Sequence, residues 1–307
     1  MITISTDHSV SPGRPVPAYC PTSLDPSAFF ENIYVSDLLP EEELCGLLTE
    51  TGLGLETIQF SVAENLDHFQ DTLTRERSRL HSLQDPPLTI HGPFLDLNPM
   101  CYDRLVREAT EYRFAQAYEA ARALGASAVI FHSGMLPGVY FLDGWAERIA
   151  DFWNHFLEKR SGIRICMENV LDPYALPLAK AASLVEHPDF SLCLDIGHAY
   201  CYSKDSLEKW VEALRPYIRH VHLHDNDGSR DQHLPLGAGT IPFKTIFASL
   251  FGKDPEGKPS FQQNTGIPGC SERSGSDTPA PSWTIECCSK EDVLRSYSFL
   301  LSAICLC

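Results

Sequence analysis

The chain alternates short apolar runs with longer amphipathic stretches along most of its 307 residues. Short apolar runs bounded by turn residues predict buried strands, and the stretches between them predict helices that cover a parallel sheet. The predicted strands are residues 32–36, 56–61, 88–91, 128–132, 164–168, 191–195, 220–224 and 283–286. Eight strand–helix pairs in strict alternation favour a closed (β/α)8 barrel, the TIM-barrel form of the α/β class, over an open sheet.

The stretches between the strands carry helix signals. The clearest helix is 102–124, where Ala, Leu, Val and Tyr recur at helical spacing before Gly125, a residue type that commonly ends helices. The other predicted helices are 40–49, 67–83, 144–159, 176–186, 206–214, 242–251 and 291–305. A barrel of this length commonly forms a single domain.

Two segments interrupt the alternation. Residues 252–282 are rich in Gly, Pro, Ser and charge, and predict a flexible insertion before the last strand, either a surface loop or a cover near the barrel rim. Residues 1–28 contain several prolines and predict an irregular lead-in. The barrel domain is therefore expected to cover residues 29–307.

Composition and cysteine usage indicate a packed cytoplasmic protein. Hydrophobic residues make up 43% of the chain and charged residues 21%, which is typical of a globular domain. Residues 1–17 have neither a basic start nor an apolar run, and no later segment has the length of a membrane helix. The 11 cysteines are an odd number without repeated CxxC spacing, so reduced thiols are expected.

The formal net charge of −17 disfavours nucleic acid as a partner, because it repels phosphate backbones at long range. A local basic groove and bound divalent cations would offset part of this effect. Few basic residues lie near the polar motifs, and Arg230 is the best candidate for binding a substrate phosphate or carboxylate. The alternative for Arg230 is a solvated loop residue. The sequence predicts no oligomeric state.

Residues that commonly bind metal ions follow one strand after another. From the third predicted strand onward, every strand ends on such a residue or leads directly into one. The residues at these strand ends are His91, His132, Glu168, Asp195 with His198, His222 and Glu286, and Asp231 and His233 follow in the loop after the seventh strand. Any one of them alone is more often an ordinary core or loop residue. Because barrel active sites form at the carboxyl ends of the strands, the whole series predicts a shared site there.

Carboxylates placed directly after apolar strands imply a cation between them, because Asp and Glu are rarely buried unless they are paired or bind a metal. Carboxylate and imidazole ligands suit a divalent metal, namely Mn²⁺, Zn²⁺, Co²⁺, Fe²⁺ or Mg²⁺. The Asp195-Ile-Gly-His198 spacing lets the aspartate end a strand while the following turn brings the histidine over the same rim. The alternative is a helix N-cap aspartate with an incidental histidine.

Three histidines alternate in the seventh predicted strand, at positions 220, 222 and 224. Alternating side chains of a strand share one face, so Val221 and Leu223 take the other face. This geometry permits a metal ligand at His222 and a more exposed role, such as contact with a substrate, at His224.

Six segments carry a resemblance to a known family. They are TIHGPFLDLNP (89–99), VIFHSG (129–134), CMENV (166–170), CLDIGHAY (193–200), HVHLHDNDGSRDQHLPLGAGTI (220–241) and WTIE (283–286). In order and spacing they resemble the xylose isomerase-like TIM barrel superfamily. This superfamily includes sugar isomerases and epimerases of the tagatose 3-epimerase and inosose type, and also phosphodiesterases of the endonuclease IV class. The resemblance is specific for the superfamily and much less specific for the reaction.

Resemblance to the epimerase branch implies one divalent metal held by Glu168, Asp195, His222 and Glu286. It also implies that the two glutamates transfer a proton through a metal-stabilised enediolate of a sugar, sugar phosphate or keto-polyol. Substrate contacts are then expected from His198, His224 and Arg230. An isomerase or epimerase acting on a small carbohydrate is the leading hypothesis for the chain.

Resemblance to the endonuclease IV branch keeps a phosphodiesterase as the alternative hypothesis. The nine ligands of its three zinc ions have counterparts here at His91, His132, Glu168, Asp195, His198, His222, Asp231, His233 and Glu286. The sequences that follow Glu168 and His222 depart from that branch, which puts contacts with DNA in doubt. A barrel that binds a sugar without catalysis is a third hypothesis, and the pair of glutamates argues against it.

Overall fold

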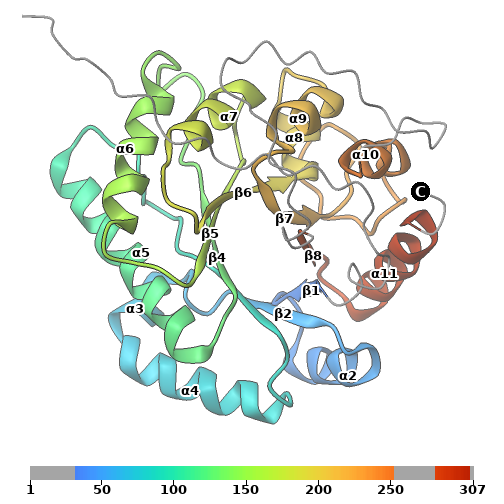
Figure 1. The fold of residues 1–307 in the computed structure, drawn as a ribbon. Helices are drawn as coiled ribbons and strands as arrows, with labels where there is room; N and C mark the ends of the chain where they lie inside the picture. The colour runs from blue at the N-terminus through green and yellow to red at the C-terminus, as the bar shows by residue number, and fades with distance from the viewer. Residues whose placement is uncertain (1–31, 252–280, 305–307) are drawn as a thin grey trace, which may run out of the picture.

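The computed structural model describes residues 32–251 and 281–304, and within them it confirms the predicted barrel. Eight parallel strands pair in chain order, and β1 pairs with β8 to close the ring. Helices surround the strands on the outside (Figure 1). The predicted lead-in at 1–28 and nearly all of the predicted insertion at 252–282 lie outside the described residues.

The strands lie close to their predicted positions. They are β1 (Ile33–Ser36), β2 (Gly54–Thr57), β3 (Leu88–His91), β4 (Ala128–His132), β5 (Arg164–Glu168), β6 (Phe190–Asp195), β7 (Ile218–Leu223) and β8 (Ser282–Ile285). The largest error is in β2, which was predicted at 56–61. Glycine is a poor strand residue, but Gly54 begins β2 because any side chain there would collide with the ring of Tyr34 in β1. β8 includes Ser282, which was predicted to end the insertion.

The helices also follow the prediction, with two differences. They are α2 (Glu41–Thr51), α3 (Ala63–Asp67), α4 (Phe69–Ser82), α5 (Arg104–Leu124), α6 (Trp145–Leu157), α7 (Ala175–Leu184), α8 (Ile196–Tyr202), α9 (Leu207–Leu214), α10 (Phe243–Leu250) and α11 (Lys290–Ile304). The single helix predicted at 67–83 is divided at His68 into α3 and α4, and α8 was not predicted. None of the helices in the described part of the chain is long and apolar enough to cross a membrane.

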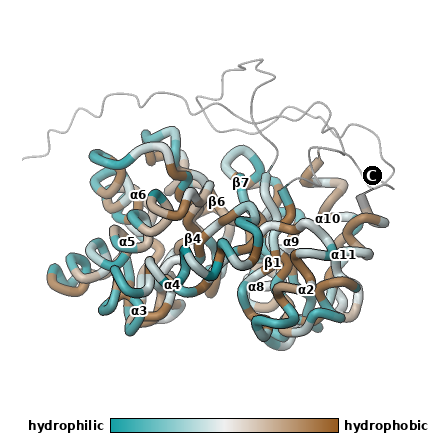
Figure 2. Tube along the Cα trace, turned by 90° about the horizontal axis from the view of Figure 1, so that it is seen from below, coloured by the Kyte–Doolittle hydropathy of each residue, from teal (hydrophilic) through white to brown (hydrophobic). Residues whose placement is uncertain are grey.

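The main hydrophobic core lies between the strands and the surrounding helices. Aromatic rings fill it where α5 and α6 cover β4: Phe114 stacks on Phe131 with ring centroids 4.1 Å apart, and Trp153 packs beside both. Hydrophobic and hydrophilic residues alternate along the helices (Figure 2), as expected for helices with one buried side. The ring of helices therefore holds the strand ends in fixed positions.

The barrel interior contains a small apolar group and a polar layer. Ala128, Ile130, Cys166 and Cys193 form a separate buried cluster. The polar layer consists of fully buried strand residues that hydrogen-bond to one another, namely Glu56, Thr89, His220 and Thr284. Buried polar groups of this kind need hydrogen-bond partners. Glu56 of this layer also contacts His222, which belongs to the site at the ends of the strands.

Candidate metal centre

The predicted ligand residues gather at the carboxyl end of the barrel. His91, His132, Glu168 and Asp195 are the last residues of β3, β4, β5 and β6. His222 lies in β7, and Glu286 directly follows β8. Because successive parallel strands end at the same rim, residues almost two hundred positions apart become neighbours.

Four residues meet at one nitrogen atom, and we call them the central group: Glu168, Asp195, His222 and Glu286. Nδ1 of His222 lies 3.3 Å from Oε1 of Glu168 and 3.4 Å from Oε1 of Glu286. Oδ2 of Asp195 lies 3.8 Å from the same nitrogen. All four side chains are buried. Three carboxylates and an imidazole thus point into one small volume, which suits a divalent cation.

A first flanking group consists of His91, His132 and Glu168. The Nε2 atoms of both histidines lie 3.6 Å from Oε2 of Glu168, whose other oxygen faces the central group. The ring of Phe94 stacks on that of His132, with centroids 4.3 Å apart. Glu168 therefore joins the two groups through its two carboxylate oxygens.

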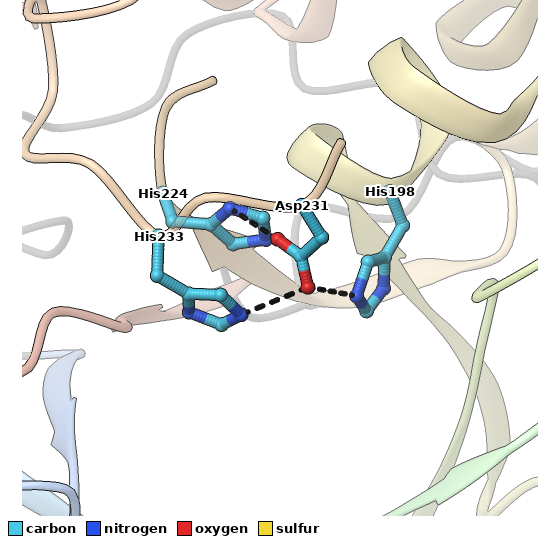
Figure 3. A group of neighbouring side chains, drawn as sticks. All are labelled: His198, His224, Asp231 and His233. Carbon is cyan, nitrogen blue, oxygen red and sulfur yellow. Dashed lines mark hydrogen bonds and ion pairs between the residues drawn. The ribbon is translucent and has the colours of Figure 1, made fainter. Parts of the chain in front are cut away.

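A second flanking group consists of His198, His224, Asp231 and His233 (Figure 3). The carboxylate of Asp231 lies among the three rings: Oδ2 is 3.3 Å from Nε2 of His198 and 3.1 Å from Nε2 of His233. Oδ1 of Asp231 is 3.4 Å from Nδ1 of His224. One donor atom from each of the four residues lies within 4.8 Å of the others.

Buried polar atoms that lack a hydrogen-bond partner indicate whether these groups are suited to bind cations. Within the described residues, each group contains at least one buried side-chain atom that has no hydrogen-bond partner. These atoms are Oε2 of Glu168, both ring nitrogens of His222, Oδ1 of Asp231 and Nδ1 of His224. An unsatisfied buried group costs roughly 1–3 kcal/mol, and a bound cation satisfies such an atom. The residues present fit divalent metal ions.

Neighbouring histidines lower the pKa of three carboxylates in these groups, Glu168, Asp195 and Asp231, and so favour the ionised form that metal binding requires. Burial by itself raises the pKa of Glu168, but His222 and His132 outweigh it and hold this pKa well below its ordinary value. Burial also raises the pKa of Asp195, but the rings of His198 and His224 outweigh burial and lower this pKa below its ordinary value. The hydrogen bonds of His198 and His233 outweigh burial at Asp231 and lower its pKa.

Glu56 of β2 belongs to the site, and the sequence analysis missed it. Its Oε1 lies 3.0 Å from Nε2 of His222, on the side of the ring opposite the central group. Its Oε2 accepts hydrogen bonds from Thr89 (3.0 Å) and Thr284 (2.8 Å). A carboxylate behind a ligating imidazole fixes which ring nitrogen carries the proton. Glu56 thus leaves Nδ1 of His222 free to face the central group. The one available signal was a glutamate inside an apolar strand.

Asp195 combines the two roles that the sequence presented as alternatives. Its side chain caps α8 by accepting a hydrogen bond from the backbone N–H of His198 at 2.6 Å, and it also faces the central group. The cap turns the chain so that His198 reaches the second flanking group. Gly197 is required between them, because a Cβ there would lie 2.0 Å from Cε1 of His224.

The more exposed position expected for His224 is wrong, while its contact with a substrate stays a prediction. Its side chain is fully buried, because the face that it shares with His220 and His222 points into the closed barrel. Arg230 is exposed in the loop beside Asp231, and its contact with a substrate stays a prediction.

Comparison with known proteins agrees with this architecture. Residues 51–257 match the family model described as xylose isomerase-like TIM barrel. The uncharacterized protein MJ1311 of Methanocaldococcus jannaschii is 30% identical over 180 residues, which are 53% of this chain and 59% of that protein. The chain therefore matches less than two thirds of the length of this relative.

Two solved structures show the same fold at lower identity. A D-tagatose 3-epimerase-like protein is 22% identical with a TM-score of 0.64, covering 90% of this chain and 97% of its own. The TTHB071 protein of Thermus thermophilus, soaked with zinc chloride, is also 22% identical with a TM-score of 0.64, covering 89% and 97%. The predicted superfamily resemblance is confirmed.

Proposed function

Because this chain belongs to the xylose isomerase-like TIM barrel family, we propose that it is a divalent-metal-dependent isomerase or epimerase. Its substrate is a sugar, a sugar phosphate or a keto-polyol. The observation that carries the proposal is the convergence of Glu168 and Glu286 on one buried nitrogen, Nδ1 of His222, beside Asp195. The likeness to a D-tagatose 3-epimerase-like protein supports the substrate class.

The two glutamates are the proton-transfer residues. One glutamate removes a proton from the carbon next to the substrate carbonyl, and a proton is returned either to the opposite face of that carbon or to the neighbouring carbon. Oε1 of each lies within 3.4 Å of the same imidazole nitrogen, so both reach the same small volume. A divalent cation in the central group would supply stabilisation of negative charge on the substrate oxygens.

Replacement of Glu286 by Gln tests this role. Gln keeps the shape and an oxygen ligand but cannot accept a proton, so proton exchange at the substrate carbon should fall by at least about 100-fold. The measurement is deuterium incorporation from D₂O into a panel of ketoses and ketose phosphates, with metal content determined in parallel. Glu291→Gln is the matched control, because Glu291 is exposed at the start of α11. Exchange by Glu286→Gln at the wild-type rate would exclude the two-glutamate mechanism.

A specific observation favours a second candidate function, a metal-dependent phosphodiesterase. The first flanking group offers two further imidazoles to Glu168, which an enzyme with one metal ion does not need. Neighbouring metal ions stabilise both the attacking and the leaving oxygen of a phosphodiester. The net charge of −17 favours a small phosphodiester over DNA as the substrate.

Replacement of His132 by Ala separates the two functions. A phosphodiesterase should lose most of its hydrolysis of bis(p-nitrophenyl) phosphate in this variant, whereas an isomerase should keep its proton exchange. His155→Ala is the control, since His155 is an exposed histidine of α6. Wild-type protein that exchanges ketose protons and leaves the phosphodiester intact would reject the second candidate.

A further inference from the structure

Asn169 has no part in the proposed reaction, yet its side chain is bonded to a residue of the central group. Nδ2 donates a hydrogen bond to the backbone oxygen of Asp195 at 2.9 Å, and Oδ1 accepts one from the backbone N–H of Asp195, also at 2.9 Å. Only one orientation of the amide places its donor at the carbonyl and its acceptor at the N–H, so the two bonds fix this side chain. Asn169 is buried, with 1% of its surface exposed.

These two bonds lie where the pairing of β5 with β6 stops. The last register pair of the two strands joins Glu168 to Cys193, and Asp195 lies further along β6. A side-chain amide offers the same kinds of donor and acceptor as a peptide group, so Asn169 takes the place of one more strand residue. The end of β6 therefore cannot move away from β5 without leaving a buried N–H and a buried C=O unpaired.

The backbone of Asn169 contacts a second candidate ligand. Its carbonyl oxygen lies 3.1 Å from Nδ1 of His198. Because a carbonyl oxygen can only accept, this contact places a proton on Nδ1 and leaves Nε2 of His198 to face Asp231, 3.3 Å away. Asn169 also follows Glu168 directly in the chain. One buried residue is thus joined to Glu168 by a peptide bond and to Asp195 and His198 by hydrogen bonds.

These contacts control the spacing of the ligands. The carboxylate of Asp195 is held at Oδ1 by the backbone N–H of His198 at 2.6 Å, and its backbone is held by Asn169. A carboxylate fixed at both ends has little freedom to turn or to shift. Ligands that are held in position bind a metal ion without reorganisation, and the residues that hold them affect the affinity strongly.

We propose that Asn169 is a positioning residue of the metal centre. It sets the distance between Glu168 of β5 and the carboxylate of Asp195 in β6, and it fixes the proton of the His198 ring. Its own side chain binds neither the metal ion nor a substrate, because both ends of the amide are used by Asp195. The proposal rests on the metal centre of the proposed function and on neither of its two candidate reactions.

Asn169→Ala tests this role against a matched control, Asn154→Ala. Asn154 makes the same pair of bonds to backbone groups away from the site: Nδ2 donates to the oxygen of Leu184 at 3.0 Å, and Oδ1 accepts from the N–H of Glu186 at 2.9 Å. Both variants should lower the melting temperature of the metal-free protein. Only Asn169→Ala should weaken zinc binding, by at least about 10-fold, as measured by competition with a chromophoric chelator.

Co²⁺ provides a spectroscopic signature that a purely structural role would not change. The visible absorption of bound Co²⁺ depends on the geometry of its ligands, so the spectrum of Asn169→Ala should differ from that of the wild type, whereas Asn154→Ala should reproduce it. Wild-type zinc affinity and an unchanged Co²⁺ spectrum in Asn169→Ala would overturn the proposal. Wild-type protein that binds neither ion would overturn the metal centre itself, so the two failures are distinguishable.

Wild-type protein also gives a measurement that does not depend on the folding of a variant. A crystal structure of the zinc-loaded protein should show both bonds between the Asn169 amide and the backbone of Asp195, with the carboxylate of Asp195 bound to the ion. An Asn169 side chain turned toward the ion, or an Asp195 carboxylate bound to zinc after both amide bonds have broken, would show that Asn169 does not position this ligand.

Discussion

The orientation of individual histidine rings at this site depends on oxygen atoms that contact the ring nitrogen facing away from the metal groups. Nδ1 of His91 contacts the backbone oxygen of Gly92 at 3.0 Å, and Nε2 of His222 contacts Glu56 at 3.0 Å. An imidazole with one nitrogen held in this way offers the other to a cation without reorganisation. Residues that never touch a metal ion therefore contribute to binding it.

Glu56→Gln should weaken divalent metal binding by about 10–100-fold, the effect typical of a lost carboxylate behind a ligating histidine. Gln removes the negative charge behind His222 and places an amide against buried donors. Affinity is measured by competition with a chelator. Glu76→Gln is the control, because Glu76 is also buried but pairs with Arg79 and Thr57 away from the site. Equal affinities for wild type and Glu56→Gln would contradict this role.

Asp172 predicts a pH dependence of stability. Burial raises its pKa to about 6, although Ser133 and the backbone N–H of Val170 donate hydrogen bonds that oppose the rise. The folded state then binds a proton more tightly than the unfolded state, so the contribution of this group to stability falls as the pH rises from about 4 to about 6. Asp172→Asn should remove a fall on the order of 3 kcal/mol. Urea unfolding of both proteins across this range measures it, and parallel curves would refute the prediction.

At the scale of elements, loop 225–241 is organised by one buried carboxylate. Oδ2 of Asp225 accepts hydrogen bonds from the backbone N–H groups of Gly237 (2.9 Å) and Gly239 (3.0 Å), and Oδ1 accepts one from Ile241 (3.2 Å). Asp225 also pairs with Leu234 through the backbone. These bonds fold the loop back so that Asp231 and His233 face the barrel.

Asp225→Asn should destabilise the protein by about 2–3 kcal/mol, because one of the two accepting oxygens becomes a donor that faces backbone N–H groups. The same variant should bind zinc less tightly in the second flanking group. Thermal unfolding and zinc titration measure the two effects. Asp227→Asn is the control, because Asp227 is exposed in the same loop. If Asp225→Asn unfolds at the wild-type temperature, the prediction is contradicted, and Asp225 orders only the loop without stabilising the whole protein.

At the scale of the whole molecule, the site gathers negative charge in a chain whose net charge is already −17. Buried carboxylates repel one another unless a cation lies between them. Binding to the folded state alone stabilises it by about 2.7 kcal/mol at a free metal concentration of 100 times Kd.

Removal of divalent ions should therefore lower the thermal stability. Melting temperatures are compared in zinc, in manganese and in excess chelator, at constant ionic strength. The melting temperature should be lowest in excess chelator, and it should return to its original value when metal is added back. A melting temperature that does not respond to chelation or to added metal would contradict metal binding by all three groups.

The arrangement of the elements and the ligand residues were largely predictable from local pattern. Periodicity predicted the strands, and β3, β4 and β5 have the predicted bounds. The position of chemistry-bearing residues at successive strand ends predicted that they would share one rim. The short helix α8 was missed because its seven residues follow directly from a strand, and it forms through the cap that Asp195 provides.

The sequence by itself determined the (β/α)8 barrel, because strand and helix periodicity are local properties, and it determined which residues end the strands. Only the tertiary structure decided that Glu56 of β2 lies behind His222 of β7, since closure of the ring leaves only β1 and β8 between these two strands. It likewise decided that His224 is buried against Asp195 and Asp231. Alternation along a strand defines which residues share a face, but only closure of the barrel decides that this face points inward.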